Sequence, residues 1–97
     1  MTSAASAAPL FVVCYDITND RERRRVDVLL GGFGHRSQKS IFECHLTPAA
    51  YRRLKEQLEA LVVTTGHIKI YRVYSGATSA VLGQAPFDPD AGYSYSI

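Results

Sequence analysis

Apolar positions along the chain form three extended runs and two helical stripes. The first run, residues 10–15, is apolar at successive positions and stops at Asp16. A strand without a polar face is expected at the centre of a sheet, covered on both sides. Two later runs, residues 41–46 and 67–74, are rich in β-branched and aromatic residues and also predict strands. A shorter strand is expected at 36–38, with a break near Lys39.

The first helical stripe follows the run that ends at Asp16. Thr18 or Asn19 can cap this helix, and apolar residues recur at i, i+3, i+4 and i+7, namely Val26, Leu29, Leu30 and Phe33. A group of glycines is expected to end it, because glycine permits a sharp turn: Gly31, Gly32 and Gly34.

The second helix is predicted to begin at Thr47-Pro48, an N-cap residue followed by proline in the first turn. Its apolar stripe comprises Tyr51, Leu54, Leu58, Leu61 and Val62, and we expect the helix to end around Thr65-Gly66. A short strand at 80–82 and another at 93–97 are further candidates.

The element order β-α-β-β-α-β predicts a ferredoxin-like α+β sandwich, an antiparallel sheet with two helices on one face. Because residues 10–15 are apolar on both faces, the open face calls for a partner, and a homodimer is the simplest one. We expect a disordered N-terminal tail at 1–9, the ferredoxin-like domain at 10–82, and a C-terminal tail at 83–97 with a possible edge strand for the dimer partner.

Size and charge change this picture little. The chain has 97 residues, enough for one domain, and domains of this size bury only about 60–65% of the surface of the unfolded chain. A net charge of +2 does not by itself indicate nucleic-acid binding. Four of the 11 basic residues, however, lie within 21–25, and three more lie at 52–55. These two basic helical faces either contact phosphates or are ordinary solvated surfaces.

Cysteine use and hydropathy bear on the compartment. Cys14 and Cys44 lie inside apolar runs without a C-x-x-C spacing, which is typical of a reduced intracellular protein and disfavours zinc. No apolar stretch reaches the length of a membrane span, and no signal peptide is evident. We therefore expect a cytoplasmic protein that has no membrane partner.

The candidate chemistry centres on Asp16. A carboxylate at the end of a buried strand, followed at once by arginines, can hold a metal ion beside a bound polyanion. Mg²⁺ commonly binds through one or two carboxylates plus substrate phosphates, and one chain offers only Asp16 in a suitable place. Two copies of Asp16 across a twofold axis could form a two-carboxylate site. Alternatively, Asp16 makes an Asx-type turn into the helix.

Several motifs in series resemble the CRISPR-associated protein two family. They are Tyr15-Asp16-Ile17, the arginine-bearing helix that opens with Asn19-Asp20, Gly32-Phe33-Gly34, and residues 38–43 (QKSIFE) followed by Leu46-Thr47. The resemblance covers residues 10–74. It implies a ferredoxin-like homodimer that is a Mg²⁺- or Mn²⁺-dependent endonuclease and partners the CRISPR integrase subunit in spacer acquisition for antiviral defence.

Carried over residue by residue, the resemblance implies that Asp16 is the metal ligand and catalytic residue, with Tyr15 as its aromatic neighbour. It implies nucleic-acid contacts from Arg21, Arg23, Arg24, Arg25, Arg36 and Ser40. Tyr15 and Phe42 are candidates for the dimer interface or for base stacking, and core packing is the alternative for Phe42. If the first strand is regular, Tyr15 and Asp16 point to opposite faces of the sheet.

Two other functions stay open. One is a non-catalytic architectural homodimer that holds duplex DNA on its basic faces and bridges integrase subunits. The other is an RNA-recognition domain, because Gly32-Phe33-Gly34 resembles part of the RNP1 motif, although this triplet closes a helix and His35-Arg36 follow it. RNA, single-stranded DNA and duplex DNA are all candidate substrates.

Overall fold

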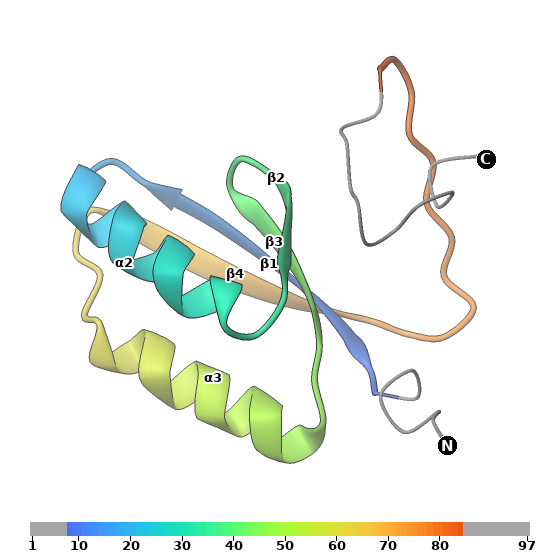
Figure 1. Cartoon of the computed structure of the whole chain (residues 1–97), viewed down its shortest axis with the longest axis horizontal. Helices are drawn as coiled ribbons and strands as arrows, with labels where there is room; N and C mark the ends of the chain where they lie inside the picture. Colours follow the sequence, from blue (N-terminus) through green and yellow to red (C-terminus); the bar gives the residue numbers. More distant parts are fainter. Residues whose placement is uncertain (1–7, 85–97) are drawn as a thin grey trace.

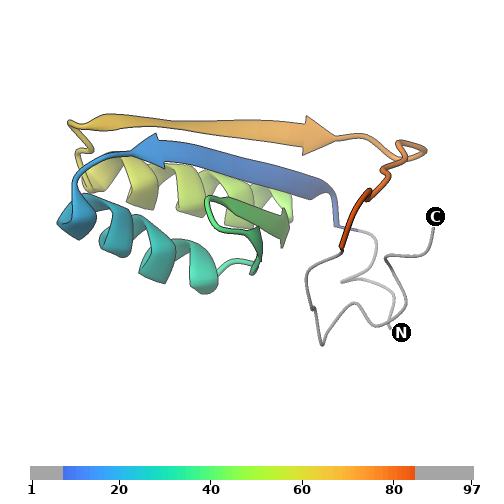
Figure 2. The same cartoon turned by 90° about the horizontal axis from the view of Figure 1, so that it is seen from above.

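The computed structural model describes residues 8–84, which form a four-stranded sheet and two helices. Both helices cover the same face of the sheet and leave the other face open (Figures 1 and 2). The sheet order is β2-β3-β1-β4, with antiparallel pairing throughout. This confirms the expected ferredoxin-like α+β arrangement. The elements are β1 (Leu10–Ile17), α2 (Asp20–Gly31), β2 (His35–Gln38), β3 (Ile41–His45), α3 (Pro48–Ala60) and β4 (Gly66–Val73).

β1 is a central strand, as its apolar run predicts. It pairs with β3 on one side and with β4 along its whole length on the other. Its alternate residues from Phe11 to Ile17 are buried beneath the helices, whereas Leu10, Val12 and Cys14 are half-buried on the open face. Within the single chain, therefore, only one face of β1 is covered by helices.

Helix α2 begins where its capping residue predicts. Of the two candidates, Asn19 is the N-cap, and its side-chain oxygen accepts a hydrogen bond from the Glu22 N–H at 2.9 Å. Val26 and Leu30 are fully buried against the sheet. After the helix, Gly34 passes so close to β3 that a Cβ at this position would lie 2.3 Å from the Glu43 carbonyl oxygen.

Helix α3 begins as predicted but ends earlier. The Thr47 hydroxyl accepts from the Ala50 N–H at 3.2 Å, Pro48 lies in the first turn, and Leu54 and Leu58 are buried. The prediction that the helix continues to Thr65-Gly66 was wrong, because the last helical residue is Ala60. Val62, assigned above to the buried stripe, instead has a left-handed φ of 53° and is 68% exposed.

The connection between β2 and β3 lies at Lys39 and Ser40, where the sequence predicts a break. The pairing of the two strands shifts register between Arg36 and Gln38. The strand predicted at 80–82 was wrong, because residues 74–84 contain no helix or strand and Leu82 is 91% exposed. The strand candidate at 93–97 and most of the predicted N-terminal tail lie outside the described residues.

Candidate functional site

Asp16 lies at the end of β1 on the open face of the sheet. It is exposed, while the preceding Tyr15 is buried on the helix side, as alternation along a regular strand requires. On one side of Asp16 lies β4, where His67 is its direct pairing partner. On the other side lies the turn at Lys39 and Ser40, held by a hydrogen bond of 3.1 Å from the Tyr15 N–H to the Ser40 carbonyl. Asp16 therefore lies between the β2–β3 turn and the first residues of β4.

The arginines of α2 do not lie beside the Asp16 side chain. α2 packs on the covered face of the sheet, whereas the Asp16 side chain belongs to the open face (Figure 2). Within residues 8–84, no hydrogen bond or ion pair joins Asp16 to an α2 arginine. Because Asp16 and the arginines are close in sequence, a single site containing both was expected. The packing of α2 instead places the carboxylate and the arginines on different faces of the sheet.

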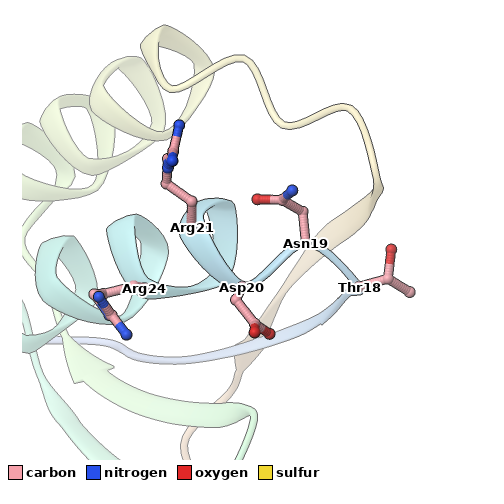
Figure 3. Close-up of a pocket in the computed structure, with 5 residues that line it drawn as sticks. All are labelled: Thr18, Asn19, Asp20, Arg21 and Arg24. Atoms are coloured by element: carbon pink, nitrogen blue, oxygen red, sulfur yellow. The ribbon is translucent and has the colours of Figure 1, made fainter.

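The exposed arginines flank a depression at the start of α2. Its volume is about 630 Å³, and the residues that line it are Thr18, Asn19, Asp20, Arg21 and Arg24. Arg21 and Arg24 leave the first turns of the helix on different sides (Figure 3). Together with the exposed Arg25, they present positive charge to solvent near one end of the molecule.

Arg23 has a structural role. Its guanidinium donates a hydrogen bond of 2.9 Å to the Ile17 carbonyl oxygen and forms an ion pair with Asp20. These contacts tie α2 to the end of β1. Of the four arginines predicted to contact nucleic acid from this helix, Arg23 is the one that makes side-chain hydrogen bonds and an ion pair within residues 8–84.

Arg36 is also engaged within the chain. It lies on β2, forms an ion pair of 3.1 Å with Asp27 of α2, and donates a hydrogen bond of 2.6 Å to the Lys39 carbonyl. Its guanidinium also lies over the Phe42 ring, 5.1 Å from the centroid. Sequence reasoning missed Asp27, because nothing in the helical pattern distinguishes it from an ordinary surface carboxylate.

Tyr15 and Phe42 belong to the core. They are 5% and 3% exposed, and their ring centroids lie 6.5 Å apart beneath the helices. Neither ring reaches the open face of the sheet, so in this chain core packing is the arrangement found for Phe42. The Tyr15 hydroxyl extends to the Asp27 carboxylate.

Glu22 was also missed, although it joins two distant segments. Its carboxylate accepts hydrogen bonds from the backbone N–H groups and the hydroxyls of both Thr64 and Thr65, at 2.6–3.1 Å. The hydrogen bonds from the Thr65 hydroxyl, and then from Thr64, lower the pKa of Glu22 from 4.5 to about 2. The segment that leads into β4, and so to His67 beside Asp16, is thereby fixed to the start of α2.

For a metal ion, one chain offers few ligands. In the part of the chain that the structure describes, no three His, Cys, Asp or Glu residues gather in a metal-binding arrangement. Burial raises the pKa of the Cys44 thiol to about 11, so this thiol stays protonated and is a poor metal ligand. Asp16 is a single exposed carboxylate, which suits Mg²⁺ held by one or two carboxylates, waters and substrate phosphates.

A comparison with known protein families agrees with this fold. The model of the CRISPR associated protein Cas2 family matches residues 9–80, which include every helix and strand found among residues 8–84. The chain belongs to the Cas2 family. The resemblance drawn from the sequence motifs is thereby confirmed.

Individual relatives agree with this assignment. A protein of Chloroflexus aurantiacus named CRISPR-associated endoribonuclease Cas2 1 is 32% identical over 80 residues, which cover 78% of this chain and 86% of the relative. A solved structure of a hypothetical protein from Thermus thermophilus has a TM-score of 0.73 at 32% identity, covering 81% of this chain and 95% of that one.

A third similar structure comes from an assembly. A chain in a structure described as a partial Cas6-RT-Cas1–Cas2 complex has a TM-score of 0.63 at 25% identity, covering 69% of this chain and 80% of that one. In that assembly, a protein similar to this chain occurs together with Cas1.

Within residues 8–84 of the present Cas2 family member, no helix is long and apolar enough to cross a membrane.

Proposed function

We propose that this Cas2 family protein is a metal-dependent endonuclease that hydrolyses phosphodiester bonds of RNA or DNA during spacer acquisition. The observation that carries the proposal is the position of Asp16, an exposed carboxylate at the end of the central strand and between two well-fixed segments. The name endoribonuclease, given to the Chloroflexus aurantiacus relative, supports the same reaction class.

Asp16 would be the residue that holds Mg²⁺ or Mn²⁺. The ion, when bound, supplies charge neutralisation at the scissile phosphate and a more acidic bound water. Lys39 and Ser40 form the turn whose backbone lies next to the end of β1, and both residues are candidates for contacts to phosphate oxygens. A homodimer joined through the open face would add a second copy of Asp16.

Binding of the polyanion is assigned to the exposed arginines of α2. Arg21, Arg24 and Arg25 are open to solvent, and phosphate contacts of this kind need no sequence readout. Arg23 and Arg36 make contacts within the chain and are assigned to structure instead.

The test compares Asp16→Asn with Glu56→Gln, which neutralises an exposed carboxylate on α3 and serves as the control. Purified proteins are incubated with labelled RNA, single-stranded DNA and duplex DNA, with Mg²⁺, Mn²⁺ or EDTA. We expect Asp16→Asn to lower the cleavage rate by about 100-fold or more, and Glu56→Gln to leave it unchanged. If the wild type cuts none of these substrates between pH 6 and 9, the nuclease proposal fails.

A second candidate function is an architectural one. The outer faces of both helices are basic, since α3 exposes Arg52, Arg53 and Lys55 in addition to the α2 arginines. A homodimer could hold duplex DNA along these faces and bridge CRISPR integrase subunits. The similar chain found with Cas1 supports this partner class. Spacer capture that survives Asp16→Asn but is lost in Arg21→Gln/Arg24→Gln/Arg25→Gln would favour the architectural function.

A further inference from the structure

Asp27 connects two residues that the sequence motifs assign to the site. One carboxylate oxygen accepts a hydrogen bond from the Tyr15 hydroxyl, and the other lies 3.1 Å from the Arg36 guanidinium. Asp27 lies on α2, Tyr15 on β1 and Arg36 on β2, so the three side chains join three elements. The Asp27 side chain is 26% exposed, and this partial burial strengthens its ion pair with Arg36 relative to a pair in open solvent.

The two partners of Asp27, Tyr15 and Arg36, both contact the turn between β2 and β3. Arg36 donates to the Lys39 carbonyl at 2.6 Å, and the Tyr15 hydroxyl lies 3.4 Å from the same oxygen. The Arg36 guanidinium also lies over the Phe42 ring, with 5.1 Å between its central carbon and the ring centroid, and this cation–π contact further restrains its position. We call Tyr15, Asp27 and Arg36 the brace.

The turn depends on such support. Neither Lys39 nor Ser40 has the backbone freedom of glycine, and the register of the two strands shifts between Arg36 and Gln38. This turn also borders Asp16, because the Ser40 carbonyl accepts a hydrogen bond of 3.1 Å from the N–H of Tyr15, the residue before Asp16. Movement of the turn would therefore change where Ser40 and Lys39 stand relative to the carboxylate.

We propose that Asp27 is a positioning residue, which through Tyr15 and Arg36 fixes the turn at Lys39 and Ser40 beside Asp16. This inference rests on the proposed function for its catalytic consequence. It assigns Arg36 to the support of the site, because the contacts of its guanidinium are to Asp27, to the turn and to Phe42.

The test uses two variants at Asp27 and a matched control. Asp27→Asn keeps the shape and can still accept from Tyr15, but it loses the ion pair, and Asp27→Ala loses both contacts. Asp20→Asn is the control, because Asp20 also pairs with an arginine on α2, namely Arg23, without touching the turn. Hydrogen exchange of the Tyr15 amide reports on the turn whether or not the protein cleaves nucleic acid.

We expect Tyr15 amide exchange to be about tenfold faster in Asp27→Ala, less affected in Asp27→Asn, and unchanged in Asp20→Asn, while β1 amides bonded to β4 keep their protection. In cleavage assays, kcat should fall about tenfold in Asp27→Ala with KM within about threefold, because misplacement of groups at the site affects the reaction more than binding.

Unchanged exchange at Tyr15, or an equal rise over all of β1, would overturn the inference. A change in KM with kcat unaltered would also overturn it, since Asp27 would then act through binding alone. If the wild type does not cleave, the exchange measurement still decides whether the brace exists, and only the nuclease proposal is lost.

Discussion

Glu22 and Thr65 lie 43 positions apart in the sequence and are joined by two hydrogen bonds. One carboxylate oxygen of Glu22 accepts from the Thr65 N–H at 3.1 Å and from its hydroxyl at 2.6 Å. The other oxygen accepts the equivalent pair from Thr64. A single side chain on α2 thus satisfies the backbone N–H groups of the two residues directly before β4, Thr64 and Thr65.

This contact predicts a pH-dependent effect of Glu22→Gln. An amide has only one acceptor oxygen, so part of the contact is lost and the melting temperature at pH 7 should fall. The pKa of Glu22 is about 2 in the folded protein and 4.5 ordinarily. A lowered pKa stabilises the fold fully above the ordinary value, and this stabilisation is lost as the pH falls toward 2.

The difference between wild type and Glu22→Gln should therefore be constant above about pH 5 and shrink between pH 4.5 and 2, measured by thermal unfolding with circular dichroism. Glu56→Gln on α3 is the control and should show no such trend. A difference that does not vary with pH would contradict the assigned role.

Val62→Gly should stabilise the protein. Val62 has a φ of 53°, where a β-branched residue is strained by about 1–2 kcal/mol and glycine is not. Because glycine also makes the unfolded chain more flexible, we expect a net gain of about 0.5–1 kcal/mol in urea unfolding. Val28→Gly, at a similarly exposed position inside α2, should instead cost about 0.5–1 kcal/mol. Destabilisation by both changes would show that the left-handed backbone at Val62 carries no strain.

Gly66→Ala should displace the start of β4. A Cβ at this position would lie 1.8 Å from the Asp16 carbonyl oxygen, so the strands must separate. We expect a loss of about 3 kcal/mol in the free energy of unfolding. Gly31→Ala is the matched control, since a Cβ there meets nothing within 4 Å and the site is helical. That control should leave stability unchanged or raise it by up to about 1 kcal/mol, whereas equal effects of the two changes would refute the close approach.

Arginine substitutions should separate binding from folding. If Arg21, Arg24 and Arg25 each contact one phosphate, changing any of them to Gln should reduce the slope of log K against log salt by roughly 0.9 for duplex DNA. Arg23→Gln should leave this slope unchanged and lower the melting temperature, because Arg23 binds the Ile17 carbonyl. Fluorescence anisotropy at several salt concentrations measures the slopes, and an equal change for Arg23→Gln would contradict the division.

Local sequence patterns predicted the order of the helices and strands well, because capping residues and the spacing of apolar residues act over only a few positions of the chain. Asn19 caps one helix and Thr47 the other, and apolar residues at helical spacing mark the buried sides. The end of α3 was misjudged because Leu61 and Val62 continue the helical spacing after the backbone has left the helix. Nothing local signals that Glu22 holds the segment beyond them.

The candidate site was predictable only in part. The apolar run that ends at Asp16 determined that a carboxylate would emerge at the end of a central strand, and alternation along the strand determined that Tyr15 would face the other way. The family motifs pointed to the same residues. These conclusions need only the period of a β-strand and the identity of neighbouring residues.

Tertiary packing decided which of these residues share a site. Placing α2 on the face opposite the Asp16 side chain separated its arginines from the carboxylate. Pairing β2 with β3 brought Arg36 to Asp27 and to the turn that borders Asp16. A sequence determines distances only between residues that are close along the chain, whereas contacts between distant segments depend on how helices and strands pack. The contacts of Asp27 and Glu22 are of the second kind, so only the folded structure shows them.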